Sequence, residues 1–256
     1  MTAERLWDGV GVALLTMFDD AGAVDLVASA KHAATLADLG VAGVLVAGTT
    51  GEADGLDDEE RAALIAAVRT AVPGVPVLAG AGAPHAAAAL RRVHAALDAG
   101  AAGVLVPPPR VCGDLRAWYE PLATAAGEHP LLGYHFPAVL GGPGLPADAL
   151  DGLPLDGVKD SSGDAERLLV ELSTWSGAVY VGSSALVHAA AALRAAGAIL
   201  AVANMVPELC IAAWDGDADA QRRLVDAHLE ARREFPHGLK AATARRFGTS
   251  VRTRLG

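Results

Sequence analysis

Cysteine and aromatic residues are scarce in this sequence of 256 residues. The two cysteines, Cys112 and Cys210, lie far apart and form no close-spaced ligand motif, so we expect neither a structural disulfide nor a metal site built on them. None of the eight histidines forms a His-x-His or His-x₃-His pair, so we expect no metal and no other cofactor. Aromatic residues make up 4% of the chain and hydrophobic residues 52%, which predicts a large core packed from small and branched side chains.

Long apolar runs and a basic start are also missing. Glycine, charge or proline interrupts each apolar stretch before it reaches the ~20 residues that span a bilayer. Residues 1–8 show no basic region followed by an apolar run, so no secretory signal is evident. The net charge of -10 argues against nucleic acid or an anionic membrane as a partner. These features predict a cytoplasmic globular protein.

Short apolar runs alternate with longer, alanine-rich amphipathic segments along most of the chain. We expect strands over 10–18, 41–47, 75–79, 103–106, 131–136, 157–159, 178–182 and 198–203. Helices are expected over 25–39, 57–71, 86–99, 115–128, 165–176 and 185–196. Eight strands that each lead to a helix, at intervals of roughly 20 to 33 residues, predict a parallel (β/α)₈ TIM barrel. The alternative, an open doubly wound sheet, is disfavoured because no glycine-rich phosphate loop follows the first strand.

The rest of the chain divides into a barrel and an extension. We predict a (β/α)₈ barrel over 1–215 and a C-terminal helical extension over 216–256, with helices over 207–214 and 217–235 and a basic end over 240–254. This basic end is either a solvated face or a subunit contact. Glycines at three helix-to-strand junctions, Gly40, Gly100 and Gly197, fit the left-handed position that ends a helix.

Lysine is rare in this chain, and one lysine lies on a predicted strand. The chain has Lys31, Lys159 and Lys240 against many more arginines. Arginine keeps its proton at working pH, whereas a desolvated lysine can become a neutral, nucleophilic amine. Lys159 is therefore a candidate for covalent chemistry with a carbonyl. In the alternative interpretation its ammonium group reaches the barrel rim or pairs with Asp160.

Other polar residues come at the ends of predicted strands, where a parallel barrel holds its active site. The turn at Thr49 and Thr50 offers successive backbone N–H groups and two hydroxyls, which suit a carboxylate. Tyr134 lies on the strand before Lys159, and neighbouring strands are ~4.8 Å apart, so both side chains can face one pocket. A tyrosine packed in the core with a satisfied hydroxyl is the alternative.

The remaining polar residues of these strand ends have structural interpretations. Glu52 is expected to anchor the turn that precedes it, and Asp160 to hold the backbone after Lys159. His135 alternates away from Tyr134 and is expected to point between strand and helix. The serines after the sixth and seventh strands lack the Gly-x-Ser-x-Gly elbow of serine hydrolases.

Taken together, these motifs resemble one enzyme family. The motifs are Gly48-Thr49-Thr50-Gly51-Glu52, Tyr134-x-x-Pro137, Gly157-Val158-Lys159-Asp160-Ser161-Ser162-Gly163 and a late Gly182…Gly197…Asn204-x-x-Pro207. Their order and spacing are similar to those of the dihydrodipicolinate synthase / N-acetylneuraminate lyase family. The resemblance covers residues 10–207.

The resemblance implies a class I, lysine-dependent aldolase acting on a 2-oxoacid, typically pyruvate. It implies that Lys159 forms the Schiff base and that Tyr134 relays protons. Thr49 and Thr50 would bind the carboxylate, with Thr49 beside the proton relay, while Gly182 and Ile199 would line the pyruvate pocket through their backbones. The family is usually homotetrameric, so a homo-oligomer, either dimer or tetramer, is expected.

Two departures from the family pattern concern the second substrate. Where dihydrodipicolinate synthases carry Thr-Pro-Tyr-Tyr after the fourth strand, this chain has Pro107-Pro108-Pro109-Arg110. The arginine that follows the Tyr-x-x-Pro proline in those enzymes is replaced by Ala138-Val139-Leu140. We therefore favour an aldolase for a 2-keto-3-deoxy sugar acid or a related pyruvate-dependent lyase. A dihydrodipicolinate synthase proper and a non-catalytic 2-oxoacid-binding protein remain alternatives.

Overall fold

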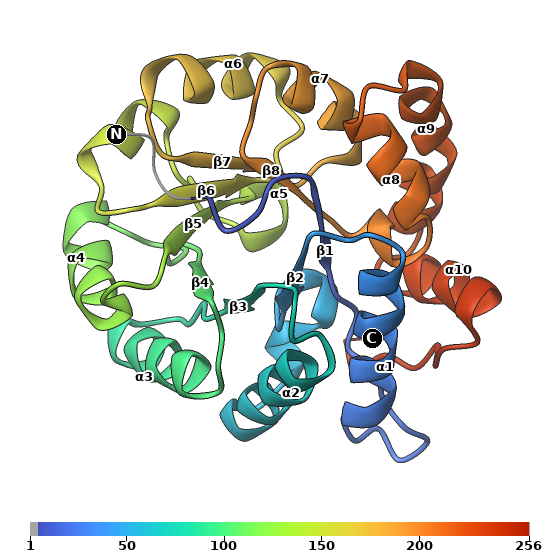
Figure 1. Ribbon diagram of the computed structural model, residues 1–256. Coiled ribbons are helices and arrows are strands. Elements are labelled where there is room, and N and C mark those ends of the chain that lie inside the picture. Colours follow the sequence, from blue (N-terminus) through green and yellow to red (C-terminus); the bar gives the residue numbers. More distant parts are fainter. Residues whose placement is uncertain (1–4, 256) are drawn as a thin grey trace.

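The computed structural model describes residues 5–255, and its eight parallel strands close into a barrel surrounded by helices (Figure 1). Residues 1–4, the start of the predicted barrel, and residue 256, the end of the predicted extension, lie outside the described residues. The strands are β1 (Val10–Ala13), β2 (Gly43–Val46), β3 (Val77–Gly80), β4 (Gly103–Val106), β5 (Leu131–His135), β6 (Gly157–Asp160), β7 (Ala178–Val181) and β8 (Gly197–Leu200). Each strand pairs with the next, and β8 pairs with β1, which confirms the predicted (β/α)₈ barrel.

The helices lie outside the barrel, mostly where the alternating pattern predicts them. They are α1 (Leu26–Asp38), α2 (Asp58–Ala71), α3 (Ala86–Asp98), α4 (Leu115–Ala126), α5 (Pro137–Leu140), α6 (Ala165–Thr174), α7 (Val187–Ala192), α8 (Pro207–Trp214), α9 (Ala218–Arg232) and α10 (His237–Phe247). Short 3₁₀ helices are η1 (Thr49–Gly51), η2 (Ala53–Gly55), η3 (Ala147–Gly152), η4 (Ser184–Leu186) and η5 (Val202–Asn204). The predicted helix over 185–196 is shorter than expected, because η4 replaces its first turn and α7 ends at Ala192.

Aspartates begin several of these helices. Asp25, Asp164 and Asp217 each accept hydrogen bonds from backbone N–H groups of the first turn of α1, α6 and α9. Asp57 and Glu60 form a reciprocal capping box at the start of α2. Such caps satisfy N–H groups that have no partner inside the helix, so these residues determine where the helices start.

The first and last strands are shorter than predicted. β1 ends at Ala13 rather than at residue 18, because the N–H group of Leu15 donates to the side chain of Asn204 instead of to a neighbouring strand. Phe18 then forms an isolated antiparallel bridge with Val24. The chain after β1 is thus a loop at the carboxyl end of the barrel, held by a hydrogen bond to the Asn204 side chain.

Two of the three junction glycines have the predicted conformation. Gly40 and Gly100 have φ of 95° and 91°, in the left-handed region. The prediction for Gly197 was wrong, because α7 ends early and Arg194 takes the left-handed position with φ of 63°. Gly197 instead begins β8, where an added Cβ would lie 2.8 Å from the carbonyl oxygen of Gly9.

The barrel interior is filled below the carboxyl ends of its strands. Leucines such as Leu45, Leu78 and Leu105 pack there with Trp7 and Tyr180 in one buried cluster. The Tyr180 hydroxyl accepts a hydrogen bond of 2.9 Å from the N–H group of Leu6. A separate, larger apolar layer lies between strands and helices. The barrel interior is therefore a packed core rather than an open channel.

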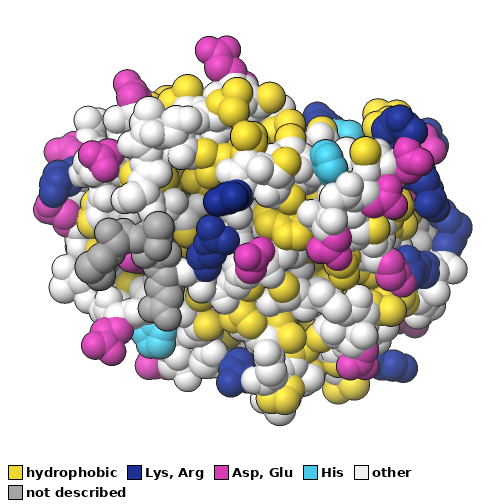
Figure 2. All heavy atoms as spheres, turned by 45° about the horizontal axis from the view of Figure 1, so that its top comes forward, with side chains coloured by type: hydrophobic (Ala, Val, Ile, Leu, Met, Phe, Trp, Pro, Cys, Tyr) yellow, Lys and Arg dark blue, Asp and Glu magenta, His cyan; other side chains and the backbone are white. Residues whose placement is uncertain are grey.

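The surface mixes both signs of charge. Acidic and basic side chains are interspersed on the face shown in Figure 2, and basic groups gather on the right, the side on which α9 lies in Figure 1. Among residues 5–255, no helix is both long and apolar enough to cross a membrane.

Candidate active site

Lys159 and Tyr134 lie side by side inside the barrel. They are directly paired in the register of β5 and β6, and Lys159 Nζ is 4.8 Å from the centre of the Tyr134 ring. The exposed fractions of the two residues are 4% and 5%. The alternative in which the lysine reaches the rim is therefore wrong.

The Lys159 amine has no carboxylate partner among the described residues. Asp160 points to the other side of the strand, where its Oδ2 lies 3.6 Å from Arg167 Nε and its Oδ1 accepts from the N–H group of Ser162 at 2.8 Å. The expectation that Asp160 holds the turn is confirmed, and the alternative that it pairs with Lys159 is wrong. Because burial penalises the ammonium form, the pKa of Lys159 falls to about 7. A large share of the amine is then neutral near neutral pH.

The phenol of Tyr134 connects the lysine to the threonine turn. Burial raises the pKa of Tyr134, and interactions with the hydroxyls of Thr49 and Ser161 partly offset that rise. The phenol therefore stays protonated at neutral pH, beside two hydroxyls that can exchange protons with it. A second tyrosine, Tyr119, is buried outside this cluster and donates to the carbonyl of Val106.

Thr49 and Thr50 begin the 3₁₀ helix η1 after β2. The N–H groups of a first helical turn have no acceptor within the helix, so they are free for a carboxylate. Ala47, just before the turn, has a left-handed φ of 52°, and the Thr16 hydroxyl donates to the carbonyl of Gly51 at 2.7 Å. The turn is thus fixed from the loop after β1 as well as from its own strand.

Gly182 lies against the lysine side chain. An added Cβ at this position would overlap the Ser161 hydroxyl and lie 3.1 Å from Lys159 Cε. Ile199 is buried on β8 in the same interior cluster as Tyr134. The structure thus brings Lys159, Tyr134, Thr49 and Gly182 together, with Thr50 adjoining and Ile199 in the surrounding layer.

Ser161 is part of the site but was not predicted as such from the sequence. Its N–H group donates to the carbonyl of His135 and so continues the hydrogen bonding between β5 and β6. Side chains two residues apart on a strand lie on the same face, so Ser161 shares the face of Lys159. The period of two along this strand was the signal that could have identified it.

A charged network lies behind the lysine strand. Arg167 bridges Asp160 and Glu171, whose Oε1 is 2.6 Å from Arg167 Nη2. Burial and the nearby charge of Asp160 raise the pKa of Glu171 to about 7, although Arg167 opposes the shift. His135 accepts from the N–H group of Leu145 at 3.0 Å, which confirms that it points outward.

Two apolar side chains lie near Tyr134 toward the mouth of the barrel. Phe136 and Leu140 pack against the interior cluster, and the Phe136 ring centre is 6.2 Å from that of Tyr134. Arg110 is exposed and donates to the carbonyl of Leu140 at 3.1 Å, at the end of α5. Arg110 is thus held at the rim by this backbone contact.

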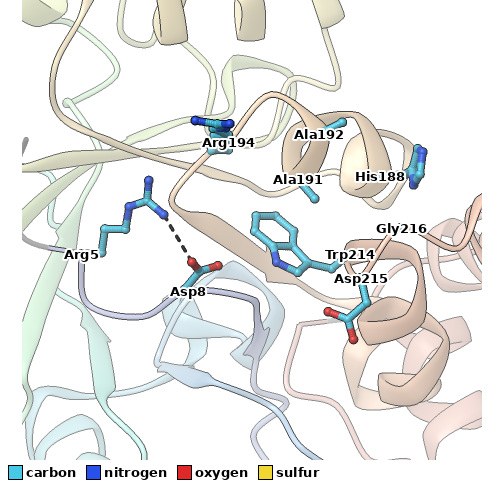
Figure 3. Close-up of a pocket in the computed structure, with 10 residues that line it drawn as sticks. Arg5, Asp8, His188, Ala191, Ala192, Arg194, Trp214, Asp215 and Gly216 are labelled. Atoms are coloured by element: carbon cyan, nitrogen blue, oxygen red, sulfur yellow. Dashed lines mark hydrogen bonds and ion pairs between the residues drawn. The ribbon is translucent and has the colours of Figure 1, made fainter.

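Other candidate sites fit less well. Within residues 5–255, no group of three His, Cys, Asp or Glu side chains is arranged to hold a metal ion. A groove of about 480 Å³ lies at the opposite, amino-terminal end of the barrel (Figure 3). Its lining includes the Arg5–Asp8 ion pair, His188 and Trp214, and among the lining residues that the structure describes no nucleophile lies beside a base.

Comparisons with known proteins find relatives over most of the chain. The sequence pattern of the Dihydrodipicolinate synthetase family matches residues 7–241. A 4-hydroxy-tetrahydrodipicolinate synthase of Synechococcus sp. is 36% identical over 207 residues, covering 76% of this chain and 68% of that protein. A probable 4-hydroxy-2-oxoglutarate aldolase, mitochondrial, of Emericella nidulans is 32% identical, covering 82% of this chain and 74% of that protein. The crystal structure of YagE from E. coli K12 in complex with pyruvate superimposes with a TM-score of 0.88 at 25% identity, covering 97% of this chain and 91% of that one.

Proposed function

The chain belongs to the dihydrodipicolinate synthetase family, and from this premise we propose that it is a Schiff-base-forming aldolase or lyase for pyruvate or a related 2-oxoacid. The observation that carries the proposal is the buried Lys159 amine, free of any carboxylate among the described residues and paired with Tyr134. A desolvated amine beside a phenol is suited to attack a carbonyl and to exchange protons with the product of that attack.

The proposed reaction begins with the neutral Lys159 amine attacking the keto carbon. The carbonyl oxygen takes up two protons, one released by the amine and one from the acid, and leaves as water, so that a protonated imine remains. Tyr134, with the hydroxyls of Thr49 and Ser161 beside it, supplies and removes these protons. The imine nitrogen withdraws electrons from the neighbouring carbon. That carbon can then lose a proton and add to an aldehyde, or a carbon–carbon bond to it can break in the reverse direction.

The 2-oxoacid carboxylate is proposed to bind at Thr49 and Thr50, through their hydroxyls and unpaired backbone N–H groups. Gly182 and Ile199 line the pocket through their backbones. Support for the role of Gly182 comes from the lack of room for a Cβ between Ser161 and Lys159.

The second substrate is proposed to be an aldehyde without a carboxylate close to its reacting carbon. Phe136 and Leu140 make an apolar wall near Tyr134, and Arg110 bonds to the backbone at the rim. We favour a 2-keto-3-deoxy sugar acid, or a similar aldol, as the compound that is cleaved or formed. The alternatives are a dihydrodipicolinate synthase proper and a non-catalytic 2-oxoacid-binding protein.

A substrate panel separates these possibilities. Purified protein would be incubated with 4-hydroxy-2-oxo acids bearing a neutral polyhydroxylated tail or a carboxylate tail, with released pyruvate measured by coupled reduction. Fastest release from the polyhydroxylated compound is the expected result. Aldehyde-dependent consumption of pyruvate with aspartate semialdehyde as the best partner would instead indicate the synthase. A covalent pyruvate adduct without turnover of any compound would indicate the binding protein.

We also propose a cellular location, an oligomeric state and a domain division for the protein. We propose a cytoplasmic homo-oligomer, dimer or tetramer, in which 1–215 is the barrel with the site and 216–256 is its helical extension. The net charge of -10 speaks against nucleic acid or a membrane surface as the partner, and the proposed partner is a small-molecule 2-oxoacid substrate. Sedimentation velocity at micromolar concentration tests the oligomer, and a single monomeric boundary would contradict it.

A further inference from the structure

The last described residues return from α10 to the carboxyl end of the barrel. Figure 1 shows this end of the chain beside α1. We call residues 250–255 the C-terminal strap. The Ser250 hydroxyl donates to the carbonyl of Phe18 at 2.7 Å, and Arg254 Nε donates to the carbonyl of Gly22 at 2.8 Å. Both acceptors lie on the loop between β1 and α1, so the strap is fastened to that loop.

The same strap also binds the loop after β2. Arg254 Nη1 donates to the carbonyl of Gly55 at 2.9 Å, and its guanidinium group makes a two-pronged ion pair with Glu60 at 2.6 and 2.7 Å. Two-pronged arginine–carboxylate pairs fix direction as well as distance. The strap thus joins the first two loops of the barrel mouth, and the second loop carries Thr49 and Thr50.

Glu52 is the point at which the strap and the extension meet the threonine turn. It is fully buried, with an exposed fraction of 0%. Its Oε2 accepts from the N–H groups of Arg254 and Leu255 at 2.7 and 2.9 Å, and its Oε1 lies 2.6 Å from Lys240 Nζ on α10. Lys240 is also fully buried, donates to the carbonyl of Arg252 and lies over the Phe18 ring. Within residues 5–255, the polar partners of the Glu52 carboxylate therefore all lie on α10 or the C-terminal strap.

This buried carboxylate adjoins the turn that is proposed to bind substrate. Glu52 has a left-handed φ of 54°, and its N–H group donates to the carbonyl of Thr49 at 3.1 Å. A left-handed backbone is unfavourable for a non-glycine residue, so surrounding contacts must hold it. Here those contacts are Lys240 and the strap.

We propose that Glu52, Lys240 and the C-terminal strap are positioning residues for the 2-oxoacid carboxylate: they hold Thr49 and Thr50 in the geometry that binds it. The inference rests on the proposed function of that turn. It gives the extension a part in catalysis that the barrel residues alone do not show. The two buried lysines then have different roles: Lys240, which is paired with Glu52, is a positioning residue, and Lys159 is the nucleophile.

The first test measures substrate binding in the Arg254→Ala variant and in a second variant, Glu52→Gln. Adducts on Lys159 would be trapped with borohydride, using pyruvate and, separately, acetone, which lacks a carboxylate. We expect the half-saturating pyruvate concentration to rise about ten-fold, while the trapping rate with acetone stays within about two-fold. Arg245→Ala is the matched control, because it removes an exposed ion pair to Glu230 without touching either loop. An unchanged pyruvate half-saturation, or equal losses with both ketones, overturns the proposal.

The second test needs no substrate, so it separates this inference from the proposed function. Hydrogen exchange would be followed in peptides covering 47–53 and, for comparison, 131–136 on β5. Arg254→Ala is expected to speed exchange in 47–53 about ten-fold and leave 131–136 unchanged, with Arg245→Ala like the wild type. Equal acceleration in both peptides would mean a merely general loss of stability and would overturn the proposal. A wild-type protein that traps acetone but not pyruvate would contradict the proposed function, whereas normal exchange in 47–53 of Arg254→Ala would contradict the strap alone.

Discussion

Lys159 and Tyr134 are direct partners across β5 and β6, with the amine 4.8 Å from the centre of the phenol ring. An aromatic face attracts an ammonium group by roughly 0.5–2 kcal/mol, which favours the charged lysine. Burial acts in the opposite direction, and the fall of the Lys159 pKa from 10.5 to about 7 corresponds to roughly 5 kcal/mol. Desolvation is thus the larger effect, and this pair presents a neutral amine to a carbonyl.

The first prediction concerns the pH dependence of adduct formation. Since only the neutral amine attacks, the rate with subsaturating pyruvate should rise with pH and level off above about 7, the pKa of Lys159. Below that pKa it should fall about ten-fold for each pH unit. Reaction at each pH would be quenched into borohydride at one fixed pH, so that the reductant does not contribute. A rate that still rises steadily between pH 8 and 10 would contradict the lowered pKa.

The second prediction concerns the phenol. Tyr134→Phe keeps the ring beside Lys159 and removes the proton donor, so adduct formation at saturating pyruvate should fall about 10²- to 10³-fold. Tyr119→Phe is the matched control, because it removes a buried hydroxyl that donates to Val106. That control should lower the free energy of unfolding by about 1 kcal/mol and leave the trapping rate unchanged. Equal trapping by Tyr134→Phe and the wild type would exclude the relay.

The third prediction concerns the glycine beside the lysine. In Gly182→Ala the new methyl group would overlap the Ser161 hydroxyl and approach Lys159 Cε, so both side chains must move. Trapping should fall at least about ten-fold, equivalent to ~1.4 kcal/mol in the barrier, while the protein stays folded. Gly152→Ala is the control, because its added Cβ meets nothing within 4 Å. If both variants trap pyruvate as fast as the wild type, Gly182 does not line the pocket.

The fourth prediction concerns Glu171 behind the lysine strand. Its folded pKa, raised to about 7, exceeds the usual 4.5, so the folded state binds more protons than the unfolded state between these values. The wild type should therefore lose stability as pH rises from 4.5 to 7, by an amount on the order of 3 kcal/mol at most. Glu171→Gln cannot ionise and should gain stability relative to the wild type between pH 5 and pH 8.

Chemical denaturation at both pH values measures this difference. Glu166→Gln, an exposed position on the same helix, is the control and should show the same difference from the wild type at each pH. A Glu171→Gln variant that becomes less stable relative to the wild type at pH 8 would mean that the ion pair with Arg167 outweighs burial.

Much of the fold could be predicted because local and periodic signals agree. Apolar strands alternate with helices, and aspartates such as Asp57 and Asp164 cap the start of those helices. Each of these patterns can be recognised from a few neighbouring residues. The wrong prediction of a left-handed backbone at Gly197 shows the limit of such local patterns. The left-handed residue is Arg194, and its position depends on where α7 ends in the folded structure.

The candidate site could be predicted only in part. Lys159 and Tyr134 are one strand–helix unit apart, so the barrel itself brings them together. The bonds of Glu52 to Lys240 and Arg254 join residues about 190 and 200 positions apart, and no local pattern indicates them. The rarity of lysine pointed to both Lys159 and Lys240 but not to their different surroundings.

The most direct test of this account is borohydride trapping with pyruvate, followed by intact mass and peptide mapping, with Lys159→Ala in parallel. Three lysines are available: Lys31 on α1, Lys240 paired with Glu52, and Lys159, which has no carboxylate partner within residues 5–255. We predict one reduced pyruvate adduct per chain, on Lys159 alone, and none in Lys159→Ala. A folded wild-type protein that gains no mass, or an adduct that persists in Lys159→Ala, would contradict the Schiff-base mechanism.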